Sequence, residues 1–382
     1  MVYDVIVIGG GAAGCFYAIN LAEKNRNLNI AILEKQKTVL SKVRVSGGGR
    51  CNVTHHCFEP KELANFYPRG AKELLPLFYE FNPSHTVEWF RERGVELKTE
   101  PDGRMFPAAN TSQAIIDCFV SEAVEYKIDV ILGMSVTDIT EAAGVWRIAT
   151  ESQIFEAEKI FIGSGSSQKV WDILQKLGHT IVPPVPSLFS FRTADEFITG
   201  LAGLACDVSI GVPGIKLAEA GALLFTHQGV SGPAVLKLSS KGAREFAELN
   251  YQFTIRINFV NTMKRDEVGE FLKRMKELEP NRIIRSTKTF DLPQRLWEKL
   301  LLRSDITADL KWKDCSQKKL NLLAENLTGL LLQIIEKSTN KEEFVTSGGV
   351  ARNEIDWKRM ESKILKNMFF GGEGMLKVVV NT

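Results

Sequence analysis

The first fourteen residues constrain the fold more strongly than any other part of the chain. An apolar, β-branched run, MVYDVIVI, leads directly into Gly9-Gly10-Gly11-Ala12-Ala13-Gly14 and then into the helix-like stretch CFYAINLAEKN. This order predicts a strand, a tight turn and a helix, as at the start of a dinucleotide-binding βαβ unit. The next apolar run ends at Glu34, roughly 20 residues further on, where such units place the acid that binds a ribose hydroxyl.

Each small residue of this turn has a physical role. Gly9 permits the sharp turn out of the strand, Gly11 has no side chain to block a pyrophosphate, and Gly14 allows close helix packing. The helix that begins at Ala12 and Ala13 offers free N–H groups and a partial positive charge to the phosphates. A carboxylate at Glu34 would repel a 2′-phosphate. The turn therefore predicts a site for FAD or NAD rather than NADP.

Length and composition set wider bounds. The chain has 382 residues, of which 44% are hydrophobic and 25% charged, and a formal net charge of +2, so we expect two or three globular domains. No apolar run approaches the length of a membrane span or a signal-peptide core. The six cysteines are scattered without a CxxC pair, which is not typical of a metal site or a disulfide scaffold. We therefore expect a cytoplasmic protein without a metal or a membrane.

A second glycine-rich stretch follows Glu34. It reads KQKTVLSKVRVSGGGRCNVT, and the three consecutive glycines predict a loop whose backbone approaches a flat ring closely. The motif SGGGRCN, placed after GGGAAG and a Glu-Lys pair, resembles the BaiN/RdsA-like (YhiN-type) NAD(P)/FAD-dependent oxidoreductases, a flavoprotein family related to aminoacetone-oxidase-type enzymes. The segments GRMFPAA, LFTHQGVSGPAVL and TSGGV are similar to further family segments, so the resemblance covers nearly the whole chain.

This resemblance implies an α/β fold: a Rossmann-like FAD-binding domain of glutathione-reductase type that carries an inserted β-rich and helical domain. It implies FAD as the cofactor. Because no second intact GxGxxG is present, we expect the electron donor to be either NADH or NADPH bound transiently over the flavin, or another protein. The implied cofactor-binding residues are Gly9, Gly11, Ala12, Ala13, Gly14, Glu34, Lys35, Ser46, Gly47, Gly48, Gly49, Arg50, Cys51, Asn52, Val136, Gly163, Gly165, Gly372 and Glu373.

Changes in pattern along the chain predict its domains. Short strands from Asp129 onward read as a meander that returns to Gly163, and Pro183, Pro184 and Pro186 predict a stiff connector. We expect the first part of the FAD-binding domain at 1–187. An inserted substrate domain would follow at 188–342, β-rich over 188–260 and helical over 261–342. The FAD-binding domain would resume at 343–382.

The resemblance weakens at the end of the chain. Family members continue past the acid at position 373 with an aspartate, a glycine-rich turn and a helix that covers the flavin, whereas this sequence ends GMLKVVVNT. A helix N-terminus beside the flavin would stabilise negative charge on its pyrimidine edge. The altered ending therefore predicts a reduced affinity for FAD.

The flavin would supply the chemistry, and the candidate catalytic residues are Arg50, Cys51, Asn52 and His227. His227 could deliver a proton or could only hold its loop, and Cys51 suits a packing role better than that of an acid. The family resemblance favours a reductase of an activated C=C bond, in a steroid-like small molecule or in uridine of ribosomal RNA. Two alternatives are an amine or aminoketone oxidase that uses oxygen, and a flavin-binding or RNA-associated protein with little turnover.

Overall fold

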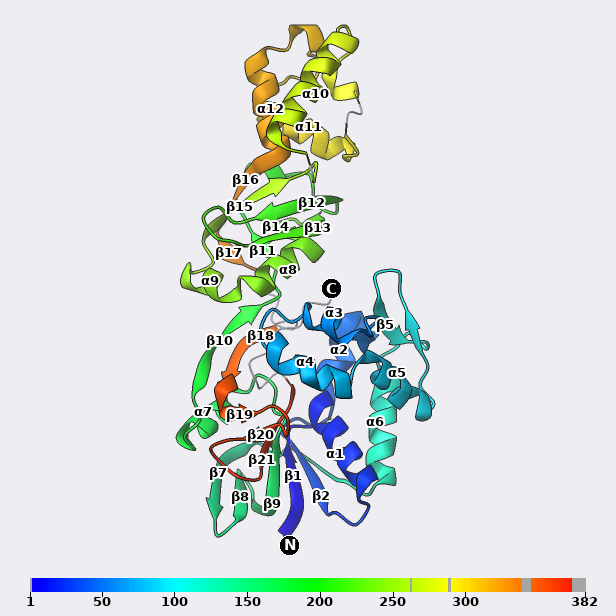
Figure 1. Ribbon diagram of the computed structural model, residues 1–382, viewed down its shortest axis with the longest axis vertical. Helices are drawn as coiled ribbons and strands as arrows, with labels where there is room; N and C mark the ends of the chain where they lie inside the picture. Colours follow the sequence, from blue (N-terminus) through cyan, green and yellow to red (C-terminus); the bar gives the residue numbers. More distant parts are fainter. Residues whose placement is uncertain (1, 262, 288–289, 339–344, 373–382) are drawn as a thin grey trace. The chain divides into compact units, whose positions relative to one another are not determined.

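The structure is a computed structural model that describes every residue except 1, 262, 288–289, 339–344 and 373–382 (Figure 1). The chain divides into two compact units. The first comprises the described residues within Met1–Val185 and Val345–Asn381, and the second those within Pro186–Phe344. The assignment of these units to cofactor and substrate stays a prediction.

The first unit is built on a sheet whose central strand is the N-terminal one. Strand β1 (Val2–Ile8) runs parallel to β2 (Ile30–Glu34) on one side and to β9 (Ile154–Ile162) on the other. Strand β6 (Asp129–Leu132) extends the sheet beyond β2, and β21 (Met368–Phe370) extends it beyond β9, both in parallel. Strands β19 (Ile355–Asp356) and β20 (Glu361–Ser362) follow in the order β19-β20-β21-β9-β1-β2-β6. The antiparallel strands β7 (Val136–Ala142) and β8 (Val145–Thr150) belong to the same nine-stranded sheet, because β8 pairs with β9.

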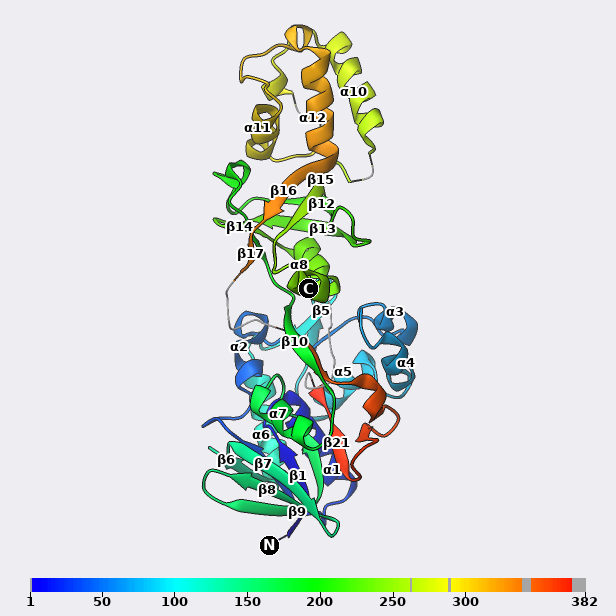
Figure 2. The same ribbon diagram turned by 90° about the vertical axis from the view of Figure 1, so that its left-hand side faces the viewer.

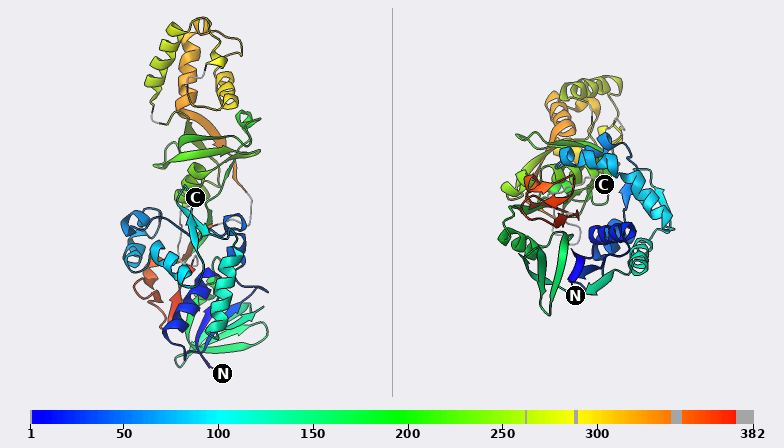
Figure 3. Two further views of the ribbon diagram at one scale, coloured as in Figure 1. Left: turned by 90° about the vertical axis from the view of Figure 1, so that its right-hand side faces the viewer. Right: turned by 60° about the horizontal axis from the view of Figure 1, so that its bottom comes forward.

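The alternation of side chains along β1 buries both faces of this sheet. Val5 and Val7 pack with α1 (Ala12–Lys24) and α6 (Gln113–Glu125), which lie side by side in Figure 3. Ile6 and Ile8 pack on the other face with β7 (Val136–Ala142), β8 (Val145–Thr150) and α7 (Gln168–Lys176), seen in Figure 2. The result is a helix layer, a parallel sheet and an antiparallel meander. The predicted Rossmann-like α/β fold class is confirmed.

Smaller elements surround this sheet. A three-stranded sheet in the order β3-β5-β4, which the sequence patterns did not reveal, lies among short helices. These elements are α2 (Ser41–Gly49), β3 (Thr54–His55), α3 (Pro60–Ala64), α4 (Ala71–Glu80), α5 (Pro83–Glu92), β4 (Leu97–Thr99) and β5 (Arg104–Pro107).

The proline-rich connector is a strand, contrary to expectation. Strand β10 (Ile181–Ser187) contains all three prolines and pairs with β18 (Val345–Val350) in a two-stranded sheet. Proline is excluded from central strands because it lacks an N–H donor, but each strand of a pair has an outward edge that needs no donor. The prolines therefore exclude a central position for β10 in a sheet, but they allow it to pair along one edge.

The second unit contains a seven-stranded sheet in the order β16-β15-β12-β13-β14-β11-β17, and a helical layer that shares one hydrophobic core with it. Its strands are β11 (Phe191–Arg192), β12 (Ala205–Gly211), β13 (Ala218–Phe225), β14 (Gly229–Ser231), β15 (Phe253–Asn258), β16 (Leu330–Ile334) and β17 (Glu336–Lys337). Its α-helices are α8 (Pro233–Lys241), α9 (Ala243–Glu248), α10 (Arg265–Leu278), α11 (Gln294–Arg303) and α12 (Gln317–Gly329).

One part of the range 261–342 corrects the sequence prediction. This range was expected to be helical, yet the chain leaves α12 at Gly329 and returns to the sheet as β16 and β17 (Figure 2). Leu330, Leu332 and Ile334 are buried while the two residues between them are exposed, which is the period of a half-buried strand. A short apolar run such as LLLQI suits a helix or a strand, so the helical pattern of the whole range did not reveal this strand.

Candidate nucleotide site

The turn between β1 and α1 has the close contacts that its glycines require. Gly9 has a φ of +107°, and a Cβ there would lie 2.6 Å from the carbonyl oxygen of Gly163. A Cβ on Gly14 would lie 2.0 Å from the carbonyl oxygen of Gly9. Around Gly11, by contrast, no described atom lies within 4 Å of such a Cβ, which would project into open space. Gly9 and Gly14 thus allow the close packing of the backbone around the turn, and Gly11 leaves open the space beside the turn.

Glu34 is bonded to this turn. Its Oε2 accepts the N–H of Gly10 at 2.8 Å, and its Oε1 accepts the N–H of Gln36 at 2.8 Å. The two bonds fix the carboxylate at the carboxyl end of β2. Because an ionised carboxylate has about four acceptor positions, Glu34 can still receive hydrogen bonds from ribose hydroxyls.

A cavity of about 500 Å³ opens at the carboxyl ends of β1, β2 and β9. In doubly wound sheets this edge is where ligands bind. The N-terminus of α1 faces this cavity through Ala12 and Ala13, and no side chain caps that end of the helix. The cavity is lined by Gly9, Gly10, Gly11, Ala12, Ala13, Glu34, Lys35, Gln36, Leu40, Ser41, Lys42, Val43, Gly163, Ser164, Gly165, Ser166, Ser167 and Gly372.

A second cavity of about 170 Å³ adjoins the first and shares Gly9, Glu34, Lys35, Ser164 and Ser167 with it. Its remaining walls include Met134, Ser135, Val136 and Val170. A narrow, partly apolar space beside a ribose-binding acid suits an adenine ring.

The residues present fit the adenosine diphosphate half of FAD. The Oγ of Ser164 is buried in the walls of both cavities and has no hydrogen-bond partner among the described residues. A buried hydroxyl without a partner is costly in a folded protein and is explained by a ligand atom that it would bind. Three independent features therefore suit a diphosphate: the Ser164 hydroxyl, the open space beside Gly11 and the uncapped N-terminus of α1.

The second glycine-rich stretch is a loop, as predicted, although it is continuous with a helix. The range of α2, Ser41–Gly49, includes residues that are not helical. Ser46 has a ψ of 147°, and Gly47 and Gly48 have φ values of 56° and 67°. Gly49 also has a positive φ, of 83°. Such a run of left-handed residues ends the helix at Val45. Residues 46–52 are not among the described residues that line the cavity of about 500 Å³.

The three polar candidates of this loop have different environments. Nη1 of Arg50 lies 2.6 Å from Oε1 of Glu100, and its guanidinium stacks 4.0 Å from the centre of the Phe106 ring. Burial raises the pKa of the Cys51 thiol, although a hydrogen bond with Ser46 opposes the shift. The Oδ1 of Asn52 is buried and has no partner among the described residues. Arg50 and Cys51 therefore have structural partners, whereas Asn52 has an unused acceptor.

His227 belongs to the second unit. It lies exposed in the turn between β13 and β14, and its neighbour in the same motif, Ser231, shares a hydrogen bond of 2.6 Å with Ser190. Glu373, the proposed acid near the flavin, falls outside the described residues, while Gly372 lines the cavity of about 500 Å³. The roles of all these residues toward a flavin stay predictions.

Several cavity residues were not found from the sequence. Leu40 has a φ of 60° and donates its N–H to the carbonyl oxygen of Gly10 at 2.8 Å, and nothing in its sequence context indicates this. Ser166 and Ser167 precede α7 and offered a usable signal, because serine is favoured at the start of a helix.

The described residues contain no group of three or more His, Cys, Asp or Glu side chains placed to hold a metal ion. None of their helices combines the length and apolar composition that crossing a bilayer would need.

Comparison with known proteins places this fold. The family model described as "HI0933-like protein Rossmann domain" matches residues 3–381. The chain is 27% identical to the ribosomal RNA dihydrouridine synthase of Escherichia coli, over 98% of this chain and 92% of that protein. It is 23% identical to the 3-dehydro-bile acid delta(4,6)-reductase of Clostridium scindens, over 96% and 91%.

Among solved structures, the chain resembles the 3-ketosteroid-delta4-(5alpha)-dehydrogenase of Rhodococcus jostii RHA1, with a TM-score of 0.51 and 11% identity. The similarity covers 99% of this chain and 92% of that one, and it concerns the fold. The chain therefore belongs to the HI0933-like Rossmann-domain family, a family of flavoprotein-type oxidoreductases, as the resemblance of its sequence implied.

Proposed function

We propose that this protein binds FAD and reduces an activated C=C bond, with uridine in ribosomal RNA as the first substrate to test. The observation that carries the cofactor assignment is the pair of adjoining cavities at the carboxyl ends of the parallel strands, with Glu34 held between Gly10 and Gln36. The residues that would hold FAD are the Gly9–Gly14 turn, Glu34, Val136, Ser164 and Gly372.

The relatives support the reaction class. One is named for making dihydrouridine in ribosomal RNA and another for reducing a bile acid. Both names describe the saturation of a C=C bond that is conjugated with a carbonyl group. Two of the relatives carry the RNA name, at 27% and 25% identity, and this favours uridine over a steroid-like molecule.

Within this proposal the protein residues bind, orient and handle protons. Reduced FAD would supply a hydride equivalent to one carbon of the double bond. Cys51 would remain a neutral thiol at the loop, because burial raises its pKa. His227 is exposed, and we propose it as the proton donor. NADH or NADPH would reduce the flavin in a separate step.

The experiment begins with the visible absorption spectrum of the purified chain and identification of any flavin released on denaturation. The flavin is then titrated anaerobically with NADH and with NADPH. We expect bound FAD that is bleached by one of them. A protein that cannot be loaded with FAD would contradict the cofactor assignment.

Substrate is tested separately on the FAD-loaded protein. Three compounds are compared. Ribosomal RNA lacking dihydrouridine and a conjugated steroid ketone are tested as electron acceptors, and a small aminoketone is tested as an electron donor. We expect dihydrouridine in the RNA, measured by mass spectrometry of its nucleosides. Saturation of the steroid would show that the substrate is a small molecule and not RNA. Peroxide formed from the aminoketone would show that the protein is an oxidase and not a reductase.

A further inference from the structure

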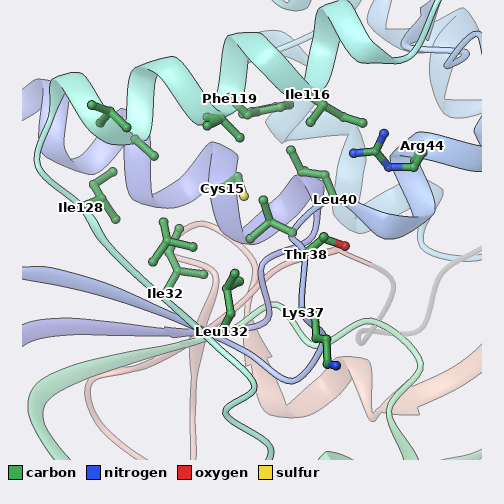
Figure 4. A pocket seen from close by; sticks show the side chains of 15 residues that line it. Cys15, Ile32, Lys37, Thr38, Leu40, Arg44, Ile116, Phe119, Ile128 and Leu132 are labelled. Carbon is green, nitrogen blue, oxygen red and sulfur yellow. The ribbon is translucent and has the colours of Figure 1, made fainter.

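A further, apolar pocket lies in the first unit and shares Leu40 with the nucleotide cavity of about 500 Å³. It has a volume of about 420 Å³, which falls in the range of about 300–1,000 Å³ typical of small-molecule sites. Figure 4 shows it between helix α6 and the edge of the sheet. It is lined by Cys15, Ile32, Lys37, Thr38, Val39, Leu40, Arg44, Ile116, Phe119, Val120, Ala123, Val124, Ile128, Val130 and Leu132.

The apolar walls come from two regular elements. Helix α6 contributes Ile116, Phe119, Val120, Ala123 and Val124, which have the spacing of one helix face. Strand β6, which forms one edge of the sheet, contributes residues that alternate onto the same side.

Part of this surface is exposed in the structure. Val120 and Val124 on the helix are 43% and 72% exposed, and Val130 and Leu132 on the strand are 38% and 41% exposed. A group of exposed aliphatic side chains around a pocket is typical of a ligand site or an interface.

The charged residues distinguish these possibilities. Lys37 and Arg44 both line the pocket and lie on the side away from Ile128 in Figure 4, with Leu40 and Thr38 between them. None of the described residues that line it is acidic, and neither cation forms an ion pair with a described residue. Arg44 donates one hydrogen bond to Oε1 of Gln113 at 2.9 Å, which leaves further guanidinium N–H groups available. An apolar space with cations along one side matches an apolar body with an anionic head.

We propose that this pocket binds an amphipathic carboxylate of the fatty-acid type, with its chain between α6 and β6 and its head at Lys37 and Arg44. The site would adjoin the nucleotide cavity at Leu40, which lines both. Cys15, at the base of the pocket, donates a weak hydrogen bond to the carbonyl oxygen of Gly10 at 3.7 Å. The ligand would therefore lie directly behind the phosphate turn.

The test is calorimetric titration of the full chain with decanoate and with decanol, which have the same chain length and differ in the charge of the head group. We expect saturable binding of both, with decanoate the tighter ligand. Lys37→Glu should weaken decanoate about threefold to tenfold, because an exposed attraction becomes a repulsion, and should leave decanol unchanged. Lys61→Glu, the same change at an exposed position on α3, is the matched control and should alter neither.

The apolar part is tested with Val124→Gln, which should weaken both ligands about threefold to tenfold through the loss of apolar contact. Ile154→Gln is its control, since Ile154 is 66% exposed and does not line the pocket. No saturable binding to the unaltered chain, or equal effects of each variant and its control, would overturn the proposal. If decanoate does not bind and Val124→Gln converts a dimer to a monomer in sedimentation, the surface is an interface between two copies and the proposal is wrong.

Discussion

The carboxylate of Glu34 accepts the main-chain N–H of Gly10 at 2.8 Å, which joins the end of β2 to the first turn of the chain. Through this bond the group proposed to bind ribose is held in a fixed position relative to the groups proposed to bind diphosphate. Both ends of the adenosine half of FAD would thus meet preformed partners, and little conformational entropy would be lost on binding.

Replacing Glu34 should therefore affect FAD more than folding. Glu34→Ala removes the charged acceptor, and a hydrogen bond to a charged group contributes about 1.5–3 kcal/mol, so FAD affinity should fall roughly tenfold to hundredfold. Glu34→Gln keeps one acceptor oxygen for Gly10 and should have an intermediate effect. Fluorescence titration with FAD and thermal unfolding of each variant measure the two quantities. Equal FAD affinities for all three proteins would show that Glu34 does not bind the ribose.

Gly11→Val should abolish flavin retention and leave the fold intact. Gly11 has a φ of −83°, which valine adopts readily, and its Cβ would meet no described atom within 4 Å, so the side chain would occupy the cavity. We expect at least a tenfold loss of FAD affinity, or about 1.4 kcal/mol. Gly269→Val is the matched control, because Gly269 on α10 also has open space around its Cβ. A fully yellow Gly11→Val protein would contradict the proposed path of the diphosphate.

Gly14→Ala should have the opposite pattern and destabilise the folded protein itself. Its Cβ would lie 2.0 Å from the carbonyl oxygen of Gly9, so helix α1 would have to move away from the turn. We expect a loss of about 1–3 kcal/mol in the free energy of unfolding, measured by denaturant titration. An unchanged unfolding midpoint would show that α1 can shift without strain.

Acid should weaken the first unit through a buried histidine. Nδ1 of His179 lies 3.1 Å from Oε2 of Glu354, and its Nε2 lies 3.0 Å from Oγ of Ser362. Burial lowers the pKa of His179, against the opposing effect of Glu354. The unfolded chain therefore takes up this proton at a higher pH than the folded chain does, and stability falls as the pH drops below the usual histidine value of about 6.5.

Glu354 acts in the same direction at lower pH. Burial by itself would raise the pKa of its carboxyl, but hydrogen bonds from Thr180 and His179 lower it, and the stability they provide is lost as the pH falls through this lowered value. Melting temperatures between about pH 7.5 and pH 5.5 should decrease less steeply in His179→Asn than in the unaltered chain. His56→Asn, at an exposed histidine, should keep the original slope. Equal slopes in all three would exclude His179 as the source.

Cys51 should react slowly with alkylating reagents. The residue is 6% exposed, and burial raises the pKa of its thiol above the ordinary value, so thiolate is scarce at neutral pH. Mass spectrometry of the peptide that contains Cys51 should show little carbamidomethylation in the native protein and complete reaction after denaturation. Cys51→Ala should retain flavin and turnover. Rapid native alkylation that FAD prevents would instead indicate a reactive thiolate at the flavin.

The nucleotide turn was predictable because its determinants are local. Gly9, Gly11 and Gly14 lie within six residues and act on one strand, one turn and one helix, so their spacing alone carries the geometry. The Rossmann-like fold class followed from the same segment. The partners of Arg50 did not, because Glu100 and Phe106 are brought to it by the three-stranded sheet that the sequence patterns did not reveal.

The strands β10 and β16 were missed for a related reason. Proline argues against a central strand and a leucine-rich run suits a helix or a strand, so for each segment only the pairing partner decides the structure. The pocket behind Leu40 was likewise hidden, since its walls come from α1, β2, β6 and α6, which are distant in sequence. A leucine at φ 60° follows from its bond to Gly10 and not from its own preferences.

The pairing of β21 with β9 also sets an order of events during synthesis. Strand β9 leaves the ribosome before any of the second unit, whereas β21 and Gly372 are made after it. On the side of β9 away from β1, residues 154–157 pair with β8, so the nascent first unit must leave residues 160–162 open while the whole second unit is translated and folds. The wall that Gly372 contributes to the nucleotide cavity is added last, so a chain interrupted during translation cannot complete that cavity.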